Sequence, residues 1–494
     1  MELSVLNGTV FGRLNGRVVR LGWQALVGML CAAPSLWAVP TADFSRETGK
    51  IRPELHSSGF GPMVCSCPQE TIDDIKSMGF SFARTHDWAL INPAERVCDY
   101  YHIFPLMHLD AKDPKNYHFG PTDYLLKRTR EETGLDIFFR LGTSIEHSGT
   151  KIHFNSLIPE DFDKVAEIFA GTIRHYNKGW ANGYGWNIKY WELWNEPDGT
   201  NNMWCEPEGD TPKNAAQRRE KFVKFFVICL KRLKSEFPDT KIGGPALCWM
   251  NPDYFKALLK GCKEAGVAPD FISWHSYSRD PDAIMRMADD ARKICDSFGF
   301  TNCELIINEW HFFGNYTWGD LRSPDPKIQE RVLSGPGAHN GIDSAAFVLA
   351  TLAKFQSSKY NQAYYYGCRH NGSWGYKDYQ AQKYKTYYAL KLFGDLVKNY
   401  PTICSVTGGA KGDPLTFAVK SADGKKSALL VVDYKGKGRT LTVNVKGVDG
   451  KKVVAKVLDS TRDVEECAAD LQNGVLKLEK ADANSAAFLV TFDL

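Results

Sequence analysis

The stretch IKYWELWNEP, residues 188–197, is a short apolar run that ends in the glutamate Glu196. A second run, ELIINEW at residues 304–310, carries Glu309 at its end in the same way. Each carboxylate stands where a predicted strand gives way to a polar, aromatic loop. In a barrel of alternating strands and helices, the carboxyl ends of the strands carry the active site. The two glutamates are therefore candidate catalytic residues at the mouth of a barrel.

Between about residue 54 and residue 400, β-like runs alternate with amphipathic helices, several of which open on Pro or end before Gly. Eight such runs predict an α/β protein with a (β/α)₈ TIM barrel. A doubly wound open sheet is the alternative, and the count of eight strands disfavours it. The expected strands are Glu54–Val64, Phe80–Asp87, Leu135–Thr143, Ile188–Glu196, Lys241–Cys248, Phe271–Ser278, Leu305–Trp310 and Gln362–Cys368.

The segments that follow the predicted strands are unequal in length. Those after the second and seventh strands, Trp88–Pro121 and His311–His339, are long and rich in aromatic residues and Pro. The segments that precede strands are short. Long loops on one face of a barrel predict a mouth that has been elaborated into a pocket.

After Pro401 the pattern of predicted elements changes to six short β-like runs that are separated by turns, with no long helix. This pattern predicts a small C-terminal β-sandwich at 401–494. The barrel domain is then expected at 39–400. The sandwich carries no obvious carboxylate pair, so we expect a structural appendage, with carbohydrate binding as the alternative.

The first 38 residues have the layout of a secretory signal peptide. An apolar run, Leu21–Cys31, is followed by small residues as far as Ala38, and the predicted cleavage follows Ala38 or Ala33. The run falls short of the ~20 residues that span a bilayer, which disfavours a membrane anchor. We therefore expect a secreted or periplasmic protein. The arginines that precede the run are Arg13, Arg17 and Arg20.

Composition excludes several classes of partner and cofactor. The net charge is +3 and no long basic run occurs, so neither nucleic acid nor an acidic membrane is expected as a partner. The 13 cysteines are scattered and lack zinc-type spacing, which predicts no metal and no cofactor. Cys295 and Cys303 flank one loop and could pair.

Alternation along the fourth predicted strand places Glu192 one layer beneath Glu196. A carboxylate that points into a barrel needs a partner, and Arg84 in the segment FARTHDW is a candidate because it stays charged and can pair through two donors. Asn195, beside Glu196, offers an amide that can bind a sugar hydroxyl. Paired carboxylates in this setting are what glycoside hydrolysis requires.

Three motifs carry a resemblance to a known group of enzymes. They are WNEP at 194–197, the His275-Ser276-Tyr277 triplet, and NEW at 308–310. They resemble the glycoside hydrolases whose catalytic glutamates end barrel strands four and seven. Within that clan, residues 54–494 are most similar to glycoside hydrolase family 39, which holds β-xylosidases and α-L-iduronidases. The RTH segment at 84–86 also suits this family.

The resemblance implies roles for individual residues. Glu196 would be the general acid/base and Glu309 the nucleophile of a retaining enzyme. Asn195 would hydrogen-bond the sugar 2-hydroxyl, and Tyr277 would hold the nucleophile Glu309. The end of the eighth strand, Tyr364–Gly375, has no acidic residue, so it cannot be matched to either known activity. Further residues expected to bind substrate are Arg84, His86, His275 and Trp374.

The function expected from these observations is a retaining glycoside hydrolase that acts from the chain end on β-linked sugars such as xylose. An endo-glycanase of a related clan family is the alternative enzyme. The long segments after strands two and seven disfavour it, because they would close one end of a groove. A sugar-binding pseudoenzyme is a third alternative, which the presence of both carboxylates disfavours. The expected partner is an oligosaccharide or glycoside substrate.

Overall fold

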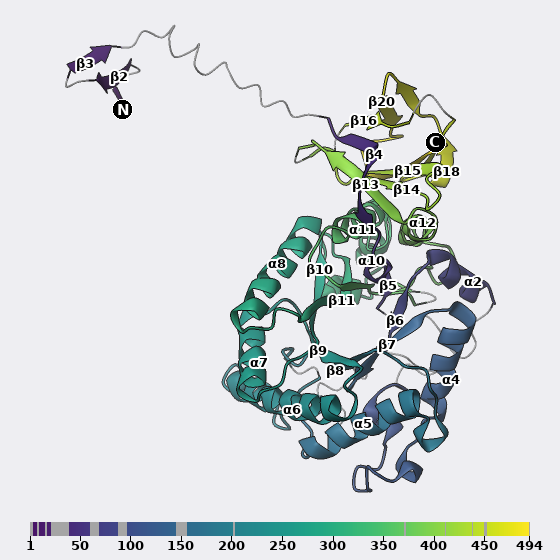
Figure 1. The fold of residues 1–494 in the computed structure, drawn as a ribbon. Coiled ribbons are helices and arrows are strands. Elements are labelled where there is room, and N and C mark those ends of the chain that lie inside the picture. Colours follow the sequence, from purple (N-terminus) through teal and green to yellow (C-terminus); the bar gives the residue numbers. More distant parts are fainter. Residues whose placement is uncertain are drawn as a thin grey trace.

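The computed structural model of the protein describes residues 3–6, 9–14, 17–20, 39–59, 69–86, 96–144, 156–200, 203–369, 372–410, 412–436, 438–448 and 452–493. Within these ranges, eight parallel strands close into a barrel in chain order (Figure 1). The predicted TIM barrel is confirmed. Its strands are β5 (Ser57–Ser58), β6 (Phe82–Arg84), β7 (Asp136–Leu141), β8 (Tyr190–Leu193), β9 (Lys241–Leu247), β10 (Phe271–Ser278), β11 (Glu304–Phe312) and β12 (Gln362–Tyr365).

Helices of the described chain surround the barrel, and their ends follow the local sequence. Helix α7 begins at Pro252 behind Asn251, whose side chain accepts a hydrogen bond from the backbone N–H of Tyr254. Helix α5 ends at Gly179, which adopts a φ of 72°. The longer helices are α2 (Gln69–Met78), α4 (Gly120–Arg128), α5 (Phe162–Lys178), α6 (Ala215–Glu236), α7 (Pro252–Glu264), α8 (Pro281–Ser297), α11 (Ile342–Phe355) and α12 (Lys385–Asn399).

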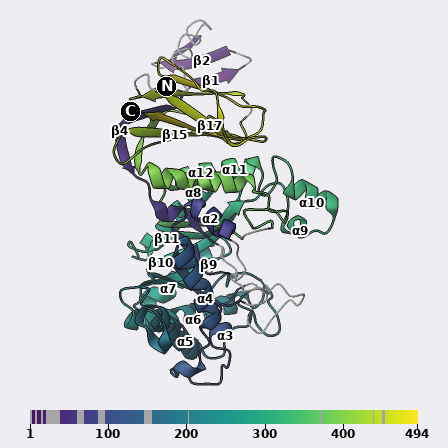
Figure 2. The same ribbon diagram turned by 90° about the vertical axis from the view of Figure 1, so that its right-hand side faces the viewer.

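The loops at the mouth carry short helices. Helix α3 (Tyr100–Ile103) follows the second barrel strand, and α9 (Trp318–Leu321) and α10 (Pro326–Leu333) follow the seventh. Figure 2 shows α9 and α10 projecting to one side of the molecule. The expectation of elaborated segments after strands two and seven is met in the part of the chain that the structure describes.

The inside of the barrel changes from apolar to polar over one layer. The lower layer is an apolar cluster of Phe138, Tyr190, Phe271, Ile306 and Tyr364, with Phe82 packed against it. Side chains two positions further along a strand share the same face. The next layer towards the mouth is therefore polar, and the buried residues there are Arg84, Arg140, Glu192, Ser273 and Asn308. This polar layer is the floor of the candidate site.

The C-terminal part forms a ten-stranded mixed sheet in the described residues, with the order β18-β17-β21-β15-β14-β13-β4-β16-β20-β19. Its C-terminal strands are β13 (Thr402–Thr407), β14 (Leu415–Lys420), β15 (Lys426–Asp433), β16 (Thr440–Lys446), β17 (Val453–Leu458), β18 (Asp463–Cys467), β19 (Asp470–Gln472), β20 (Val475–Glu479) and β21 (Ala486–Asp493). Helices α11 and α12 lie between this sheet and the barrel strands (Figure 2).

The domain boundary differs from the expected one at its N-terminal side. Residues 41–50, assigned above to the barrel domain, form β4 (Thr41–Lys50) in the ten-stranded sheet. This strand pairs antiparallel with β13 and parallel with β16. Its buried side chains Ala42 and Phe44 enter the apolar core of the sheet. The chain thus contributes one strand to the sheet before it enters the barrel.

The N-terminal segment is described only in part. Residues within 3–20 form a three-stranded antiparallel sheet of β1 (Leu3–Leu6), β2 (Thr9–Leu14) and β3 (Arg17–Arg20). The apolar run and the cleavage sites of the predicted signal peptide lie outside the described residues. Among the residues that the structure describes, no helix has the length and apolarity needed to cross a membrane.

Candidate active site

Arg84 donates hydrogen bonds to three residues at the polar layer of the barrel. Its Nε donates to Oε2 of Glu192 at 2.7 Å, and one terminal nitrogen donates to Oε1 of Glu309 at 2.9 Å. The other terminal nitrogen donates to Oδ1 of Asn195 at 2.6 Å. The structure thus brings together the Arg84–Glu192 pair expected from the sequence and joins it to Asn195 and Glu309.

Glu192 is held on its other side by neutral donors. Its Oε1 accepts hydrogen bonds from Oγ of Ser273 at 2.6 Å and from Nδ2 of Asn308 at 2.7 Å. Its partners Arg84, Ser273 and Asn308 are all buried. Since a buried charge is tolerated when it is paired and hydrogen-bonded, Glu192 serves as an anchor for Arg84. It has no open side for a substrate.

The WNEP turn presents Glu196 at the mouth. Strand β8 ends at Leu193, and Trp194 and Glu196 adopt positive φ values of 74° and 44°. The backbone N–H of Glu196 donates to the carbonyl of Ala246 at 2.8 Å. Left-handed non-glycine residues cluster at functional sites, where surrounding contacts fix them. This turn brings the Glu196 carboxylate to within 2.9 Å of His275 and leaves its side chain only 14% exposed.

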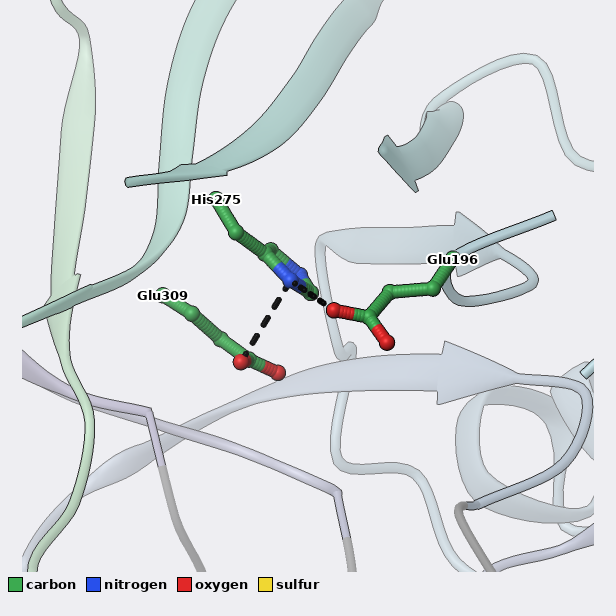
Figure 3. Close-up of side chains that lie close together, drawn as sticks. All are labelled: Glu196, His275 and Glu309. Carbon is green, nitrogen blue, oxygen red and sulfur yellow. Dashed lines mark hydrogen bonds and ion pairs between the residues drawn. The ribbon is translucent and has the colours of Figure 1, made fainter. Parts of the chain in front are cut away.

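Glu196 and Glu309 face each other across His275 (Figure 3). Nδ1 of His275 lies 2.9 Å from Oε1 of Glu196 and 3.4 Å from Oε2 of Glu309. One oxygen of each carboxylate and this nitrogen all lie within 4.8 Å of one another. Carboxyl groups ~5–5.5 Å apart are typical of retaining glycosidases, whereas inverting enzymes place them ~6.5–9.5 Å apart. The observed separation of the facing oxygens is compatible with the closer, retaining arrangement.

The two carboxylates have different surroundings. The Glu309 side chain is 5% exposed and that of Glu196 is 14% exposed. Burial raises the pKa of Glu309, and the negative charge of Glu196 raises it further, while His275, Arg84 and the hydrogen bond from Tyr277 lower it. The Tyr277 hydroxyl donates to Oε2 of Glu309 at 2.6 Å. Arg84 and Tyr277 therefore favour the ionised form of a buried carboxylate.

His275 is neutral in this arrangement. Burial lowers its pKa to about 4. In the described chain its Nε2 is buried and has no hydrogen-bond partner, while Nδ1 faces both carboxylates. A neutral ring between two acceptors keeps its proton on the nitrogen that faces them, so we infer that Nδ1 donates to Glu196.

The remaining predicted residues lie around this centre. Nε2 of His86 lies 3.4 Å from Oε1 of Glu309, and burial lowers the pKa of His86 well below its usual value. Trp374 is partly buried at the mouth, with its ring 5.7 Å from Tyr277 and 5.3 Å from Tyr366. All eight residues expected at the site therefore fall in one region of the barrel mouth.

Sequence reasoning missed one acidic residue of the site. Asp198 follows Glu196 by two positions, and its Oδ1 accepts the backbone N–H of Cys248 at 2.9 Å. Burial raises the pKa of Asp198 to about 6, and the charge of Glu196 also raises it. The signal was present as the Asp next to Pro197, but a loop acid carries little information without its surroundings.

Glu196, His275 and Glu309 also have the residue types and spacing of a metal site. The guanidinium of Arg84, 2.9 Å from Glu309, already supplies a positive charge to this carboxylate. A divalent cation would have to share that carboxylate against the repulsion of Arg84. The arrangement fits one carboxyl group that transfers a proton to substrate and one that acts as a nucleophile better than it fits metal binding, and the absence of a metal requirement remains a prediction.

Comparison with known proteins agrees with this geometry. Residues 43–293 match the family described as glycosyl hydrolases family 39. The chain belongs to this family, and the resemblance seen in the sequence is confirmed.

Two curated relatives are β-xylosidases. The protein of Geobacillus stearothermophilus is 28% identical over 232 residues, which cover 44% of this chain and 42% of the relative. That of Caldicellulosiruptor saccharolyticus is 27% identical over 293 residues, which cover 57% of this chain and 47% of the relative. The match thus spans less than half the length of each relative.

Solved structures share the fold at low sequence identity. A glucosidase from Croceicoccus marinus superimposes with a TM-score of 0.70 at 20% identity, covering 92% of this chain and 99% of that one. An α-L-arabinofuranosidase from Thermotoga maritima gives a TM-score of 0.60 at 13% identity, covering 92% and 100% of the two chains. These similarities support the fold of barrel and sheet over nearly the whole chain.

Proposed function

We propose that this protein is a retaining, exo-acting glycoside hydrolase for β-linked sugars, with β-xylosides as its first candidate substrates. The observation that carries the proposal is the spacing of Glu196 and Glu309, whose facing oxygens lie within 4.8 Å of one another. The similarity to two β-xylosidases supports the choice of sugar.

In the first step, the Glu309 carboxylate attacks the anomeric carbon while Glu196 gives its proton to the departing oxygen. Arg84 and Tyr277, at 2.9 and 2.6 Å, hold the two oxygens of Glu309 in a fixed orientation for this attack. The bond to the leaving group breaks as the ester between Glu309 and the sugar forms.

In the second step, Glu196 takes a proton from water, which attacks the anomeric carbon and frees Glu309. The switch of Glu196 from acid to base follows from electrostatics. Negative charge on Glu309 favours the protonated form of Glu196, and this repulsion disappears once Glu309 is esterified. The donor Nδ1–H of His275, 2.9 Å from Glu196, then stabilises the ionised form.

Asn195 is the proposed partner of the sugar 2-hydroxyl. Arg84 donates to its Oδ1 at 2.6 Å, which fixes the orientation of the amide group. In the part of the chain that the structure describes, its Nδ2 donates to Sδ of Met203, a weak acceptor, at 3.4 Å. The amide therefore has donor capacity for a hydroxyl at the anomeric centre.

A panel of 4-nitrophenyl glycosides tests the proposal, with β-xyloside, β-glucoside, α-L-arabinofuranoside and β-glucuronide as members. We expect the β-xyloside to be cleaved fastest, and xylan to release xylose from its ends. Internal cleavage of xylan would instead support the endo-glycanase alternative. No turnover of any glycoside, with binding retained, would support the pseudoenzyme.

We also propose that the protein is exported, because residues 13–38 have the layout of a signal peptide. N-terminal sequencing of protein from its native host should find a chain that begins after Ala38 or Ala33. Recovery of chains that retain the apolar run in a cytoplasmic fraction would contradict export.

A further inference from the structure

Two cysteines face each other across a short turn at the start of barrel strand seven. Cys295 lies in the last turn of α8, and Cys303 directly precedes Glu304, the first residue of β11. Both side chains are buried, with exposed fractions of 0% and 4%. Helix α8 also contacts β11 (Figure 1). The two cysteines thus lie where the helix after strand six meets strand seven.

Hydrogen bonds to the backbone hold the two cysteines in this turn. The carbonyl of Cys295 accepts the N–H of Phe300 at 3.0 Å, and the carbonyl of Phe300 accepts the N–H of Cys303 at 3.2 Å. From α8, the guanidinium of Arg292 donates to the carbonyl of Cys303 at 2.6 Å and to that of Phe300 at 2.5 Å. The backbone at both cysteines is therefore held in place independently of their sulfur atoms.

The side chains of the two cysteines interact with each other. A hydrogen bond with Cys303 lowers the pKa of the Cys295 thiol, and the same contact raises the pKa of the Cys303 thiol. Both groups are thiols in this structure. A disulfide requires two side chains that point toward each other from backbones that already lie close together. The contact between these thiols, within a turn that other bonds hold, therefore favours a bond between the sulfurs.

The preceding turn from helix to strand is similar but has a single cysteine. Cys262 lies in the last turn of α7, and its carbonyl accepts the N–H of Val267 at 3.0 Å. Asp270 directly precedes β10, as Cys303 precedes β11. Cys262 is fully buried, and burial raises its pKa to about 12. A cysteine at the end of such a helix is thus a simple core residue where an aspartate takes the second position, and Cys262 provides a matched control.

We propose that Cys295 and Cys303 form a disulfide in the mature protein, with the disulfide of a small thiol or of a thiol oxidoreductase as the oxidant. One cysteine thiolate attacks the oxidant and releases its first sulfur, and the other thiolate then attacks the mixed disulfide and releases the second sulfur. The two cysteines lose two protons and two electrons, and the oxidant becomes two thiols. Export, as proposed above, would place the chain in a compartment that favours this exchange.

The disulfide would join the helix that follows strand six to the start of strand seven. A bond between two points of the chain stabilises a fold mainly because it restricts the unfolded state. Glu304 and Glu309 are five positions apart on β11, so the bond lies ~16 Å along the strand from the proposed nucleophile. We therefore expect the disulfide to stabilise the barrel at the end of the strand that lies away from its mouth.

Mass spectrometry of the full chain tests the pairing. The protein is incubated with glutathione disulfide in mild denaturant, where transient opening exposes buried thiols, and is then unfolded in iodoacetamide. Chymotrypsin cuts after Phe298 and Phe300, between the two cysteines. We expect fragments in which Cys295 and Cys303 are joined, and a Cys262 fragment that carries the alkyl group. If Cys295 or Cys303 is alkylated, carries glutathione or is joined to another cysteine, the proposal is overturned.

Thermal unfolding gives a second measurement. A strong reductant should lower the unfolding midpoint of the oxidised protein by a few degrees, and it should have no effect on Cys303→Ala. In the control Cys262→Ala, the midpoint should fall because packing is lost, but the effect of the reductant should persist. An equal effect of the reductant on Cys303→Ala would overturn the proposal. Neither measurement uses turnover, so both remain decisive if the proposed hydrolysis fails.

Discussion

Arg84 and Glu309 form a buried ion pair, with 2.9 Å between the guanidinium nitrogen and Oε1 of the carboxylate. Arg84 is inaccessible to solvent, and it also donates to Glu192 and Asn195. One guanidinium therefore fixes the proposed nucleophile, the amide beside the proposed acid/base, and the buried anchor carboxylate. Burial raises the pKa of Glu309, and His275 and Arg84 oppose this rise.

Replacing Arg84 by Met should move the pH dependence of catalysis as well as its rate. Without the guanidinium, the pKa of Glu309 rises further, so the acidic limb of kcat/KM should move to higher pH. We expect kcat to fall at least ~10²-fold, because the ion pair orients the nucleophile. The unfolding free energy should drop by ~3–5 kcal/mol, since Glu192 is left as an unpaired buried charge.

Arg140→Met is the matched control for this prediction. Arg140 is also fully buried and pairs with a carboxylate, Asp99, at 2.6 Å. Replacing Arg140 by Met should lower the unfolding free energy in the same way, but the acidic limb of the kcat/KM profile should not move. The measurements are pH profiles of kcat/KM and thermal unfolding curves of both variants. If the acidic limb of the Arg84 variant stays where it is in the unchanged enzyme, the role given to Arg84 is contradicted.

The unchanged enzyme should show a bell-shaped pH profile on the acidic side of neutral. Glu309 must be ionised to attack, so activity falls as pH decreases through its pKa. Because burial raises that pKa above the usual value of 4.5, the acidic limb should lie above 4.5. The alkaline limb reports loss of the proton from Glu196. A profile that is flat from acid to alkaline pH would show that another pair of groups does the chemistry.

Tyr277→Phe should lower kcat by ~10–100-fold, because a hydrogen bond to a charged group is worth ~1.5–3 kcal/mol. The deleted hydroxyl donates to Oε2 of Glu309 at 2.6 Å. Tyr360→Phe deletes another buried hydroxyl, which donates to the carbonyl of Ile284 at 2.9 Å on the outer layer of the barrel. Steady-state kinetics should find the second variant close to the unchanged enzyme. Equal rates for both variants would remove Tyr277 from the mechanism.

Periodicity predicted the barrel because each strand and helix carries its own apolar pattern. Strand β4 was not predicted, because its sequence lacks such a local apolar pattern. Its sequence, TADFSRETGK, has few apolar residues, and it forms a strand by pairing with β13 and β16, both more than 350 positions away. Pairing between distant segments leaves no local signal in a polar sequence.

The residues of the site also divide into those with a local sequence signal and those without one. Glu196 and Glu309 were predictable because each closes a short apolar run in the sequence, although β8 ends at Leu193 and β11 continues to Phe312. The Arg84–Glu192 pair followed from side-chain alternation and the cost of an unpaired buried charge. Ser273 and Asn308 were not identified, because a buried Ser or Asn is a common feature of many barrels. Only their hydrogen bonds to Glu192, at 2.6 and 2.7 Å, reveal their part in the floor of the site.

Removal of divalent cations should leave the rate unchanged. Proton transfer and attack by Glu309 need no metal in the proposed reaction, although Glu196, His275 and Glu309 have the spacing of a metal site. Dialysis against a strong chelator followed by assay with an aryl glycoside measures this. Loss of activity that a single divalent ion restores would reassign the three residues as a metal centre.

Glu196→Ala and Glu309→Ala should fail in different ways. Loss of Glu309 deletes the nucleophile, so every substrate should be cleaved several orders of magnitude more slowly. Loss of Glu196 deletes proton donation, which is typically worth ~10²–10⁴-fold and matters most for poor leaving groups. An aryl glycoside with an acidic phenol needs little help, so the Glu196 variant should still form the glycosyl-enzyme and then hydrolyse it slowly.

Azide distinguishes the two roles by stereochemistry, because it attacks without a general base. In Glu196→Ala it should attack the glycosyl-enzyme and give a glycosyl azide of retained configuration. In Glu309→Ala it should occupy the space of the missing carboxylate, attack the substrate directly and give the inverted product. Nuclear magnetic resonance of the products measures the configuration at the anomeric carbon. Products of the opposite configuration would exchange the roles of Glu196 and Glu309, and identical behaviour of the two variants would remove the distinction between them.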